Sequence, residues 1–175
     1  KKEYERYYGL YEIGFSILLF IIVTIALIMI LPFVSIYTRG ITDIQYVDAY
    51  LPILFTLILL MNQIRVPAIV TINVAGAFKE TQNGAIIEAL INIIVSLVLF
   101  FFTPLGLYGL LIGTVCSYIY RTSDVIIYVY KHLIERNILK YVKLISVNTV
   151  TAIILYILFN VLFPVTAATF IQWII

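Results

Sequence analysis

The sequence predicts an all-α integral membrane protein, a bundle of helices that cross the bilayer several times. Hydrophobic residues make up 63% of the 175 residues and charged residues only 11%, whereas soluble domains carry roughly 25% charged residues. The apolar residues gather in stretches of about the 20 residues that a helix needs to cross the hydrocarbon core. All basic residues except Arg65 and Arg121 lie outside these stretches, almost entirely on alternate loops. Together these observations favour a bilayer as the solvent of the fold.

Five full spans and an incomplete sixth are expected in order along the chain. The full spans are expected at 13–38, 49–75, 84–102, 107–130 and 144–162. Thr103-Pro104-Leu105-Gly106 separates the third from the fourth, because Pro and Gly interrupt helices and the apolar run is too long for one span. Residues 164–175 are too few to cross, so we interpret them as a truncated helix, with a re-entrant segment as the alternative.

The charges of the loops predict the orientation of the bundle. With these spans, eight basic residues lie on one side: Lys1, Lys2, Arg6, Lys79, Lys131, Arg136, Lys140 and Lys143. The other side receives Arg39 alone, beside Asp43 and Asp48. Basic loops stay in the cytoplasm. We therefore expect a multi-pass protein of the cytoplasmic membrane in which the N-terminal segment KKEYERYYG is a cytoplasmic loop.

A polar segment, GAFKETQNG at 76–84, interrupts the apolar sequence between the second and third spans. Gly76 and Gly84 suit the ends of helices, and Asn83 is a candidate cap for the helix that follows. The simplest interpretation is a solvated cytoplasmic turn with a positive-inside lysine.

Polar residues recur at helical spacing inside three of the spans. The second span holds Asn62, Arg65 and Asn73 on one face, the third holds Glu88, Asn92 and Ser96, and the fourth holds Gly109, Gly113, Ser117 and Arg121, with Asp124 one turn beyond. Arg65 lies about ten residues, hence ~15 Å, from the inner end of its span. An arginine at that depth is expected to face protein or water rather than lipid. Pro67 is expected to kink the helix beside it.

Each of these patterns also has a structural interpretation. Gly109 and Gly113 form a small-xxx-small surface suited to helix packing. Arg121 and Asp124 are spaced to pair with each other, and Glu88 is placed either to snorkel to the interface or to neutralise Arg65. Two alternatives stay open for Arg65, a structural ion pair or a cation that lines a cavity.

The segment KHLIERNILKYVK, residues 131–143, connects the fourth and fifth spans. Its apolar residues can share one face of a helix that lies on the inner leaflet, with basic residues on the other face. A plain cytoplasmic linker with positive-inside charges is the equal alternative.

Three stretches resemble one family. NVAGAFKETQNGAIIEALINIIVSLVLFF, GLYGLLIGTVCSYIYRTSDVIIYV and, upstream, FVSIYTRGITDIQYVDAYLPILF are similar to the C-terminal half of Wzx-type polysaccharide-biosynthesis flippases of the MATE-like exporter superfamily. The similarity covers most of residues 30–130. Relatives often carry a histidine at the position of Ala77, which therefore receives no role. The resemblance implies two six-helix lobes around a central cavity. Residues 1–130 would be four helices of the second lobe, 131–143 an amphipathic cytoplasmic linker and 144–175 an additional C-terminal pair, with the first lobe missing.

The same resemblance implies a function. The substrate would be a polyprenyl-diphosphate-linked oligosaccharide, with membrane lipids, the missing lobe of the chain and a polysaccharide polymerase as further partners. Its diphosphate would require cationic, hydrogen-bonding side chains. The candidate substrate-binding residues are Arg65, Asn62, Asn73, Arg121 and Asn92; the candidate ion-coupling residues are Glu88 and Asp124; the cytoplasmic motif comprises Gly76, Phe78, Lys79, Glu80, Thr81 and Gln82.

Other classes remain as alternatives. A cation-coupled multidrug antiporter of the same fold is the closest rival, followed by a membrane polysaccharide polymerase and a membrane scaffold. No GxxxxGK motif is present, which argues against ATP hydrolysis by this chain. The single Cys116 and single His132 argue against the usual zinc sites. We therefore expect no enzymatic activity, catalytic residue, metal or cofactor, and no nucleic-acid partner.

Overall fold

The computed structural model describes residues 2–40, 48 and 50–162, and helices account for nearly all of them. The elements are α1 (Lys2–Tyr37), α2 (Tyr50–Ile64), α3 (Val66–Ala75), α4 (Phe78–Phe102), α5 (Leu107–Tyr128), the π-helical turn η1 (Val129–Leu133) and α6 (Leu139–Leu162). No strand occurs within these residues. Five segments of the described chain are long and apolar enough to cross a membrane: α1, α2 with α3, α4, α5 with η1, and α6. The predicted polytopic helical membrane protein is therefore confirmed at this level.

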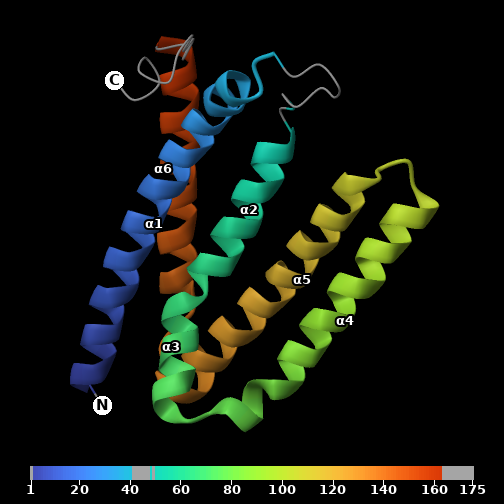
Figure 1. Cartoon of the computed structure of the whole chain (residues 1–175). Coiled ribbons are helices and arrows are strands. Elements are labelled where there is room, and N and C mark those ends of the chain that lie inside the picture. Colours follow the sequence, from blue (N-terminus) through green and yellow to red (C-terminus); the bar gives the residue numbers. More distant parts are fainter. Residues whose placement is uncertain (1, 41–47, 49, 163–175) are drawn as a thin grey trace.

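The helices run up and down, so the connections fall at two ends of the bundle (Figure 1). The start of α1, the α3–α4 junction and the segment between α5 and α6 lie at one end. The described basic residues of these segments, with the first turns of α6, are Arg6, Lys79, Lys131, Arg136, Lys140 and Lys143. We name this end the basic end. The α4–α5 turn and the last turns of α1 and α6 lie at the opposite end.

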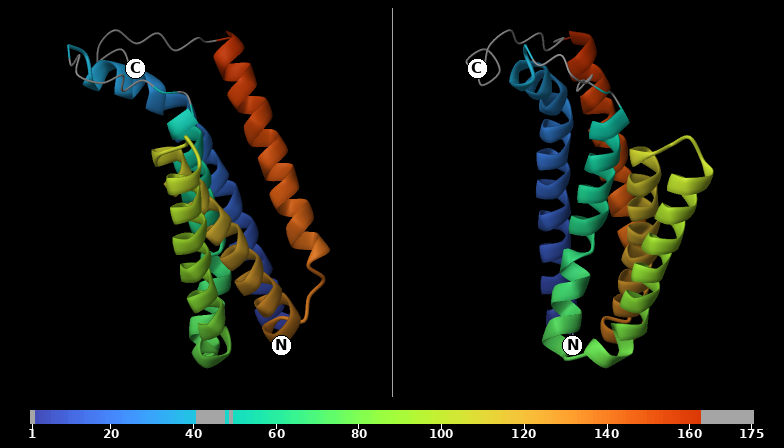
Figure 2. Two further views of the ribbon diagram at one scale, coloured as in Figure 1. Left: turned by 90° about the vertical axis from the view of Figure 1, so that its right-hand side faces the viewer. Right: turned by 45° about the vertical axis from the view of Figure 1, so that its right-hand side comes forward.

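Close helix packing is concentrated in the α4–α5 hairpin. A Cβ added to Gly109 would lie 2.9 Å from Leu99 Cβ, and one added to Gly113 would lie 2.2 Å from Ser96 Oγ. The expected packing role of the two glycines is confirmed. By contrast α6 stands to one side of the bundle and packs mainly against α1 (Figure 2).

Two sequence-based expectations about helix ends are wrong. Residues 2–12 belong to α1 rather than to a loop, and Glu12 is buried. The polar segment 76–84 is not a solvated turn, because α4 begins at Phe78, which places Asn83 inside the helix rather than at its cap. Only Gly76 behaves as expected, since it ends α3 with a φ of 67°, a conformation that glycine adopts without strain.

The connection between α5 and α6 is a linker rather than a continuous amphipathic helix. Helical structure ends at Leu133 and resumes at Leu139, so an amphipathic helix over 131–143 is not formed. Ile134 lies between them and is fully buried in a cluster with Tyr8, Val125 and Val129. Burial of this side chain anchors the linker to the basic end of the bundle. The expected sixth, truncated helix at 164–175 lies outside the described residues.

Candidate functional site

Four charged side chains meet inside the bundle. Arg65 Nη1 donates to Glu88 Oε1 at 2.8 Å, and Arg121 Nε lies 3.6 Å from Glu88 Oε2. Arg121 Nη1 also donates to Asp124 Oδ2 at 2.6 Å. The side chains of Arg65, Glu88 and Arg121 are only 10%, 19% and 13% exposed, whereas that of Asp124 is 34% exposed at the edge of the network. We name these four residues the buried charge network.

Arg65 occupies a break in the second span. α2 ends at Ile64 and α3 begins at Val66, with Arg65 between them and Pro67 in the first turn of α3. Proline has no N–H to donate to the preceding turn, so it favours an interruption at this point. The hydroxyl of Thr122 on α5 donates to the carbonyl of Met61 at 3.0 Å and joins α5 to the last turn of α2. Pro67 was expected to kink the helix, and the structure shows a break between two helices at this point.

The guanidinium of Arg65 has further contacts and one unused donor. Nη2 donates to Asn62 Oδ1 at 3.0 Å, and the guanidinium carbon lies 4.7 Å from the centre of the Tyr118 ring. Arg65 Nε is buried and has no hydrogen-bond partner within the described residues. A buried N–H without a partner is costly. Arg65 Nε can therefore donate one more hydrogen bond, to an acceptor on a polar ligand or to water.

Arg121 and Asp124 pack against a glycine of α4. A Cβ on Gly84 would lie 2.0 Å from Asp124 Oδ2 and 2.4 Å from Arg121 Nη1. Arg121 Nη1 also donates to the carbonyl of Thr81 at 3.0 Å. Gly84 therefore makes room for this ion pair instead of ending a helix, which corrects the sequence-based interpretation. The sequence did hold a sign of this role, because Gly84 precedes Glu88 by four residues and both therefore lie on one helical face.

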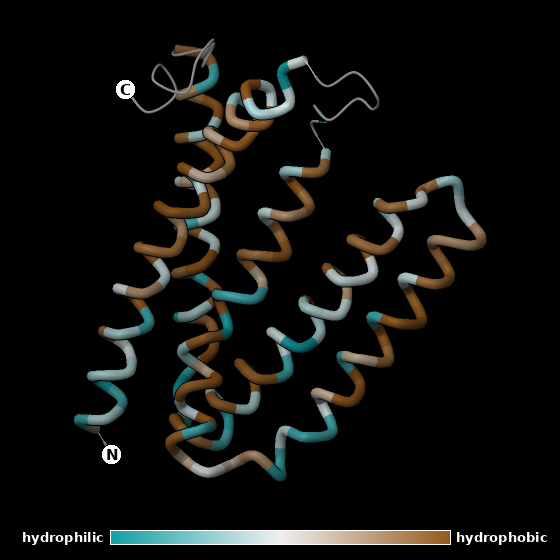
Figure 3. Tube along the Cα trace, viewed as in Figure 1, coloured by the Kyte–Doolittle hydropathy of each residue, from teal (hydrophilic) through white to brown (hydrophobic). Residues whose placement is uncertain are grey.

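A layer of neutral polar side chains continues the network between α4 and α5. Asn92 Nδ2 lies 3.4 Å from Ser117 Oγ and 3.5 Å from Thr114 Oγ1, and Ser96 Oγ donates to Asn92 Oδ1 at 3.3 Å. These contacts join the polar faces predicted for the third and fourth spans. Figure 3 shows hydrophilic positions that interrupt the otherwise apolar α4 and α5.

Most of the other predicted site residues lie apart from this network, although the carbonyl of Thr81 accepts from Arg121. Asn73 is exposed on α3, beyond the break, although helical spacing placed it on the face of Arg65. Of the cytoplasmic motif, Thr81 is buried, whereas the exposed members are Gly76, Phe78, Lys79, Glu80 and Gln82. Of the alternatives that the sequence leaves open, the pairs Arg65–Glu88 and Arg121–Asp124 are both formed. The network therefore contains two cations and two anions.

Sequence reasoning missed a second buried polar cluster, at the basic end. Tyr130 Oη donates to Glu12 Oε2 at 2.5 Å, and the Tyr130 ring lies against Tyr8 and Tyr141 at centroid distances of 6.2 and 5.7 Å. Glu12 is only 4% exposed. The only signal in the sequence was a carboxylate and tyrosines at span boundaries, which an interfacial aromatic belt would also produce.

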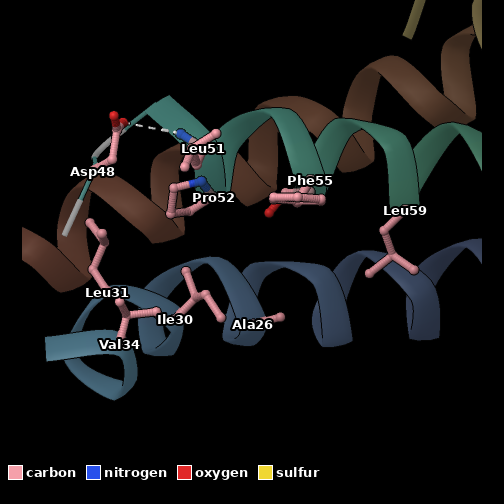
Figure 4. Close-up of a pocket in the computed structure, with 10 residues that line it drawn as sticks. Ala26, Ile30, Leu31, Val34, Asp48, Leu51, Pro52, Phe55 and Leu59 are labelled. Carbon is pink, nitrogen blue, oxygen red and sulfur yellow. Dashed lines mark hydrogen bonds between the residues drawn. The ribbon is translucent and has the colours of Figure 1, made fainter. Parts of the chain in front are cut away.

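A cavity of about 380 Å³ lies between α1 and α2, far from the charge network (Figure 4). Its walls are apolar apart from Thr56 and Asp48. Asp48 Oδ1 accepts hydrogen bonds from the backbone N–H groups of Tyr50 and Leu51, as an N-cap of α2 does. The Tyr108 hydroxyl donates to Asp48 Oδ2, and together with the Tyr50 amide it lowers the pKa of the Asp48 carboxyl.

Fold and site together define a polytopic helical membrane protein with a buried charge network at a break in its second span. No group of three or more His, Cys, Asp or Glu side chains suited to a metal ion occurs in the described part of the chain. Comparisons of the chain with known protein families, with curated proteins and with solved structures find no match.

Proposed function

We propose that this chain is part of a membrane flippase that moves polyprenyl-diphosphate-linked oligosaccharide across the cytoplasmic membrane for surface polysaccharide export. The observation that carries the proposal is Arg65, a buried arginine at a helix break within a membrane-spanning segment. Interrupted helices at membrane depth occur where the backbone is buried in protein or lines a polar cavity, and in transporters they often form binding sites. The family resemblance of residues 30–130 supports the same class.

The chemistry of Arg65 suits a diphosphate. A guanidinium presents a planar fork of donors that matches the oxygens of a phosphate group. Arg65 Nε has no hydrogen-bond partner within the described residues, and Arg65 Nη1 donates to Glu88. An entering diphosphate would accept a hydrogen bond from Nε and compete with Glu88 for Nη1. Arg121 lies on the other side of Glu88 and would supply the second cation. The polyprenyl tail would stay in lipid, since it is apolar.

Within this proposal the basic end faces the cytoplasm, as the positive-inside rule requires. Single cysteines replacing the exposed Glu80 and Leu105, in a Cys116→Ser background, place one thiol at each end of the bundle. An impermeant thiol reagent added to whole cells should label Leu105→Cys and leave Glu80→Cys unlabelled until the cells are permeabilised. The reverse pattern would overturn the orientation.

A binding measurement on the purified chain tests the substrate class. We expect it to bind a polyprenyl-diphosphate-linked oligosaccharide more tightly than a cationic amphiphilic drug, the ligand of the rival antiporter. Replacing Arg65 by Met and Glu88 by Gln together keeps the net charge and should abolish this preference. The matched control is Glu80→Gln, which removes an exposed carboxylate outside the network.

Two outcomes would contradict the proposal. Undiminished glycolipid binding by the double variant would leave Arg65 and Glu88 as a structural ion pair only. Tighter binding of the cationic drug, lost on Glu88→Gln alone, would favour the antiporter.

The proposal also sets the partners of this chain. It acts with a first lobe that completes the cavity and with a polysaccharide polymerase that uses the exported product. Membrane lipids surround the exposed apolar faces of α4 and α6.

A further inference from the structure

A basic groove lies between α1 and the start of α6, away from the buried charge network. Its cavity of about 310 Å³ is lined by the basic side chains Arg136, Lys140 and Lys143 and by the apolar side chains Ile13, Leu144 and Val147. The groove lies at the basic end, where a membrane-spanning helix leaves the hydrocarbon core. It therefore combines a cationic rim with an apolar wall.

The charge of this groove is not neutralised by neighbouring carboxylates. Glu12 also lines it, but its carboxylate is buried and accepts the hydrogen bond of Tyr130. Within residues 2–40, 48 and 50–162, no carboxylate forms an ion pair with Lys140 or Lys143. Three cations therefore face one anion across the groove.

Arg136 packs against α1 at Gly9, where the lack of a side chain leaves room for the guanidinium. A Cβ at that position would lie 2.6 Å from Arg136 Nη1. The backbone of Arg136 is also anchored, since its N–H donates to the carbonyl of Tyr130 at 3.0 Å. The guanidinium is thus placed at the mouth of the groove by the fold rather than left free in solvent.

A second, separate cavity of about 90 Å³ lies further along the same two helices. It is lined mainly by Ile17, Ile21 and Thr24 of α1 and by Thr151, Ala152 and Leu155 of α6. Asn148 of α6 also lines it and donates to Ser16 Oγ of α1 at 3.1 Å. Ile17 follows Ile13 by one helical turn, and Thr151 follows Val147 by one turn. The two cavities therefore follow one another along α1 and α6, the first basic at the end of the bundle and the second mainly apolar.

We propose that the α1–α6 groove binds an anionic phospholipid of the leaflet at the basic end. Its headgroup phosphate contacts Arg136, Lys140 and Lys143, and one acyl chain follows the apolar part of the groove. We choose an anionic lipid on the ground of charge complementarity, because basic pockets between membrane-spanning helices bind anionic headgroups in preference to zwitterionic ones. The site shares no residue with the charge network, so it does not depend on the proposed flippase function.

Lipid binding by the purified chain in an uncharged detergent tests this site. Native mass spectrometry can measure the bound fraction against the concentration of phosphatidylglycerol, with phosphatidylcholine as the zwitterionic comparison. We expect one tight phosphatidylglycerol, and about hundredfold weaker binding for the triple variant Arg136→Gln, Lys140→Gln, Lys143→Gln. Glycerol phosphate, which has the headgroup without the chains, should not displace the lipid at equal concentration.

The matched control removes the same charge from the same end but outside the groove. Arg6→Gln, Lys79→Gln, Lys131→Gln should change the affinity by no more than about twofold, since short-range contacts rather than the field of the whole end hold the lipid. If the triple variant fails to fold, Lys143→Glu at an exposed position tests the same point. Equal losses in the two triple variants, unchanged binding by Lys143→Glu or displacement by glycerol phosphate would each overturn the proposal.

Discussion

Substitutions at Arg65 and Glu88 should have strongly coupled effects on the stability of the bundle. At the observed 2.8 Å and an effective dielectric constant of about 20, the Coulomb attraction is about 6 kcal/mol. Most of this is offset by the cost of removing both charges from water. We therefore expect Arg65→Met and Glu88→Gln each to cost about 3 kcal/mol, because each leaves a buried charge with fewer partners. The double variant should cost only about 4 kcal/mol, which corresponds to a coupling energy of about 2 kcal/mol.

A double-mutant cycle on the purified chain measures this coupling. Unfolding by a denaturing detergent, followed by far-UV circular dichroism, would give the free energies of the wild type, both single variants and the double variant. The control cycle pairs Arg65→Met with Glu80→Gln, an exposed carboxylate outside the network, and should be additive. Additivity within about 0.5 kcal/mol in the Arg65–Glu88 cycle would refute the ion pair as an energetic unit.

Two further predictions concern helix packing and a capped helix end. Gly113→Ala should destabilise the chain by about 1–3 kcal/mol, because the added Cβ would lie 2.2 Å from Ser96 Oγ. Gly14→Ala, which has open space around it, should stabilise the chain slightly in the same unfolding assay. The second concerns Asp48, whose pKa is lowered in the fold by the Tyr108 hydroxyl and the Tyr50 amide. The contribution of the ionised Asp48 to the stability of the fold should be fully present above the ordinary Asp pKa of about 3.9. It should be lost as the pH falls through the lower pKa that Asp48 has in the folded protein. The thermal midpoint of unfolding should therefore decrease as the pH is lowered across this range. Tyr108→Phe should make that decrease smaller. An unchanged pH profile in the variant would contradict the role of the hydroxyl.

Several features of the candidate site were predictable because they depend on local spacing. Glu88, Asn92 and Ser96 recur every four residues and do line one face of α4 toward α5. Pro67 predicted a kink in the second span, where the structure has a break, since the missing N–H acts within a single turn. The pair Arg121–Asp124 was also predictable, because residues three apart are neighbours on a helix.

Other features could not be predicted, because they depend on how helices cross. Asn73 shares the spacing of Asn62 and Arg65, yet the break at Arg65 separates it from the charge network. Gly84 was interpreted as a helix end, whereas its role is to admit the side chains of α5. Helical periodicity gives the face of a residue only while the helix is continuous.

The sequence by itself determined the class of this protein and the number and approximate positions of its described spans. The thickness of the bilayer sets the length of an apolar helix, so spans can be read from composition alone. The placement of most described basic residues at one end also follows, because loops alternate between the two ends of an up-and-down bundle.

Only the tertiary structure decided which polar groups of different spans meet. Glu12 and Tyr130 are 118 residues apart, and the partners of the Arg65–Glu88 pair come from different helices. Contacts of this kind depend on the rotation and crossing of packed helices, which local sequence periodicity does not encode. The same holds for the α1–α6 groove, where Gly9 admits Arg136 only because the linker returns to α1.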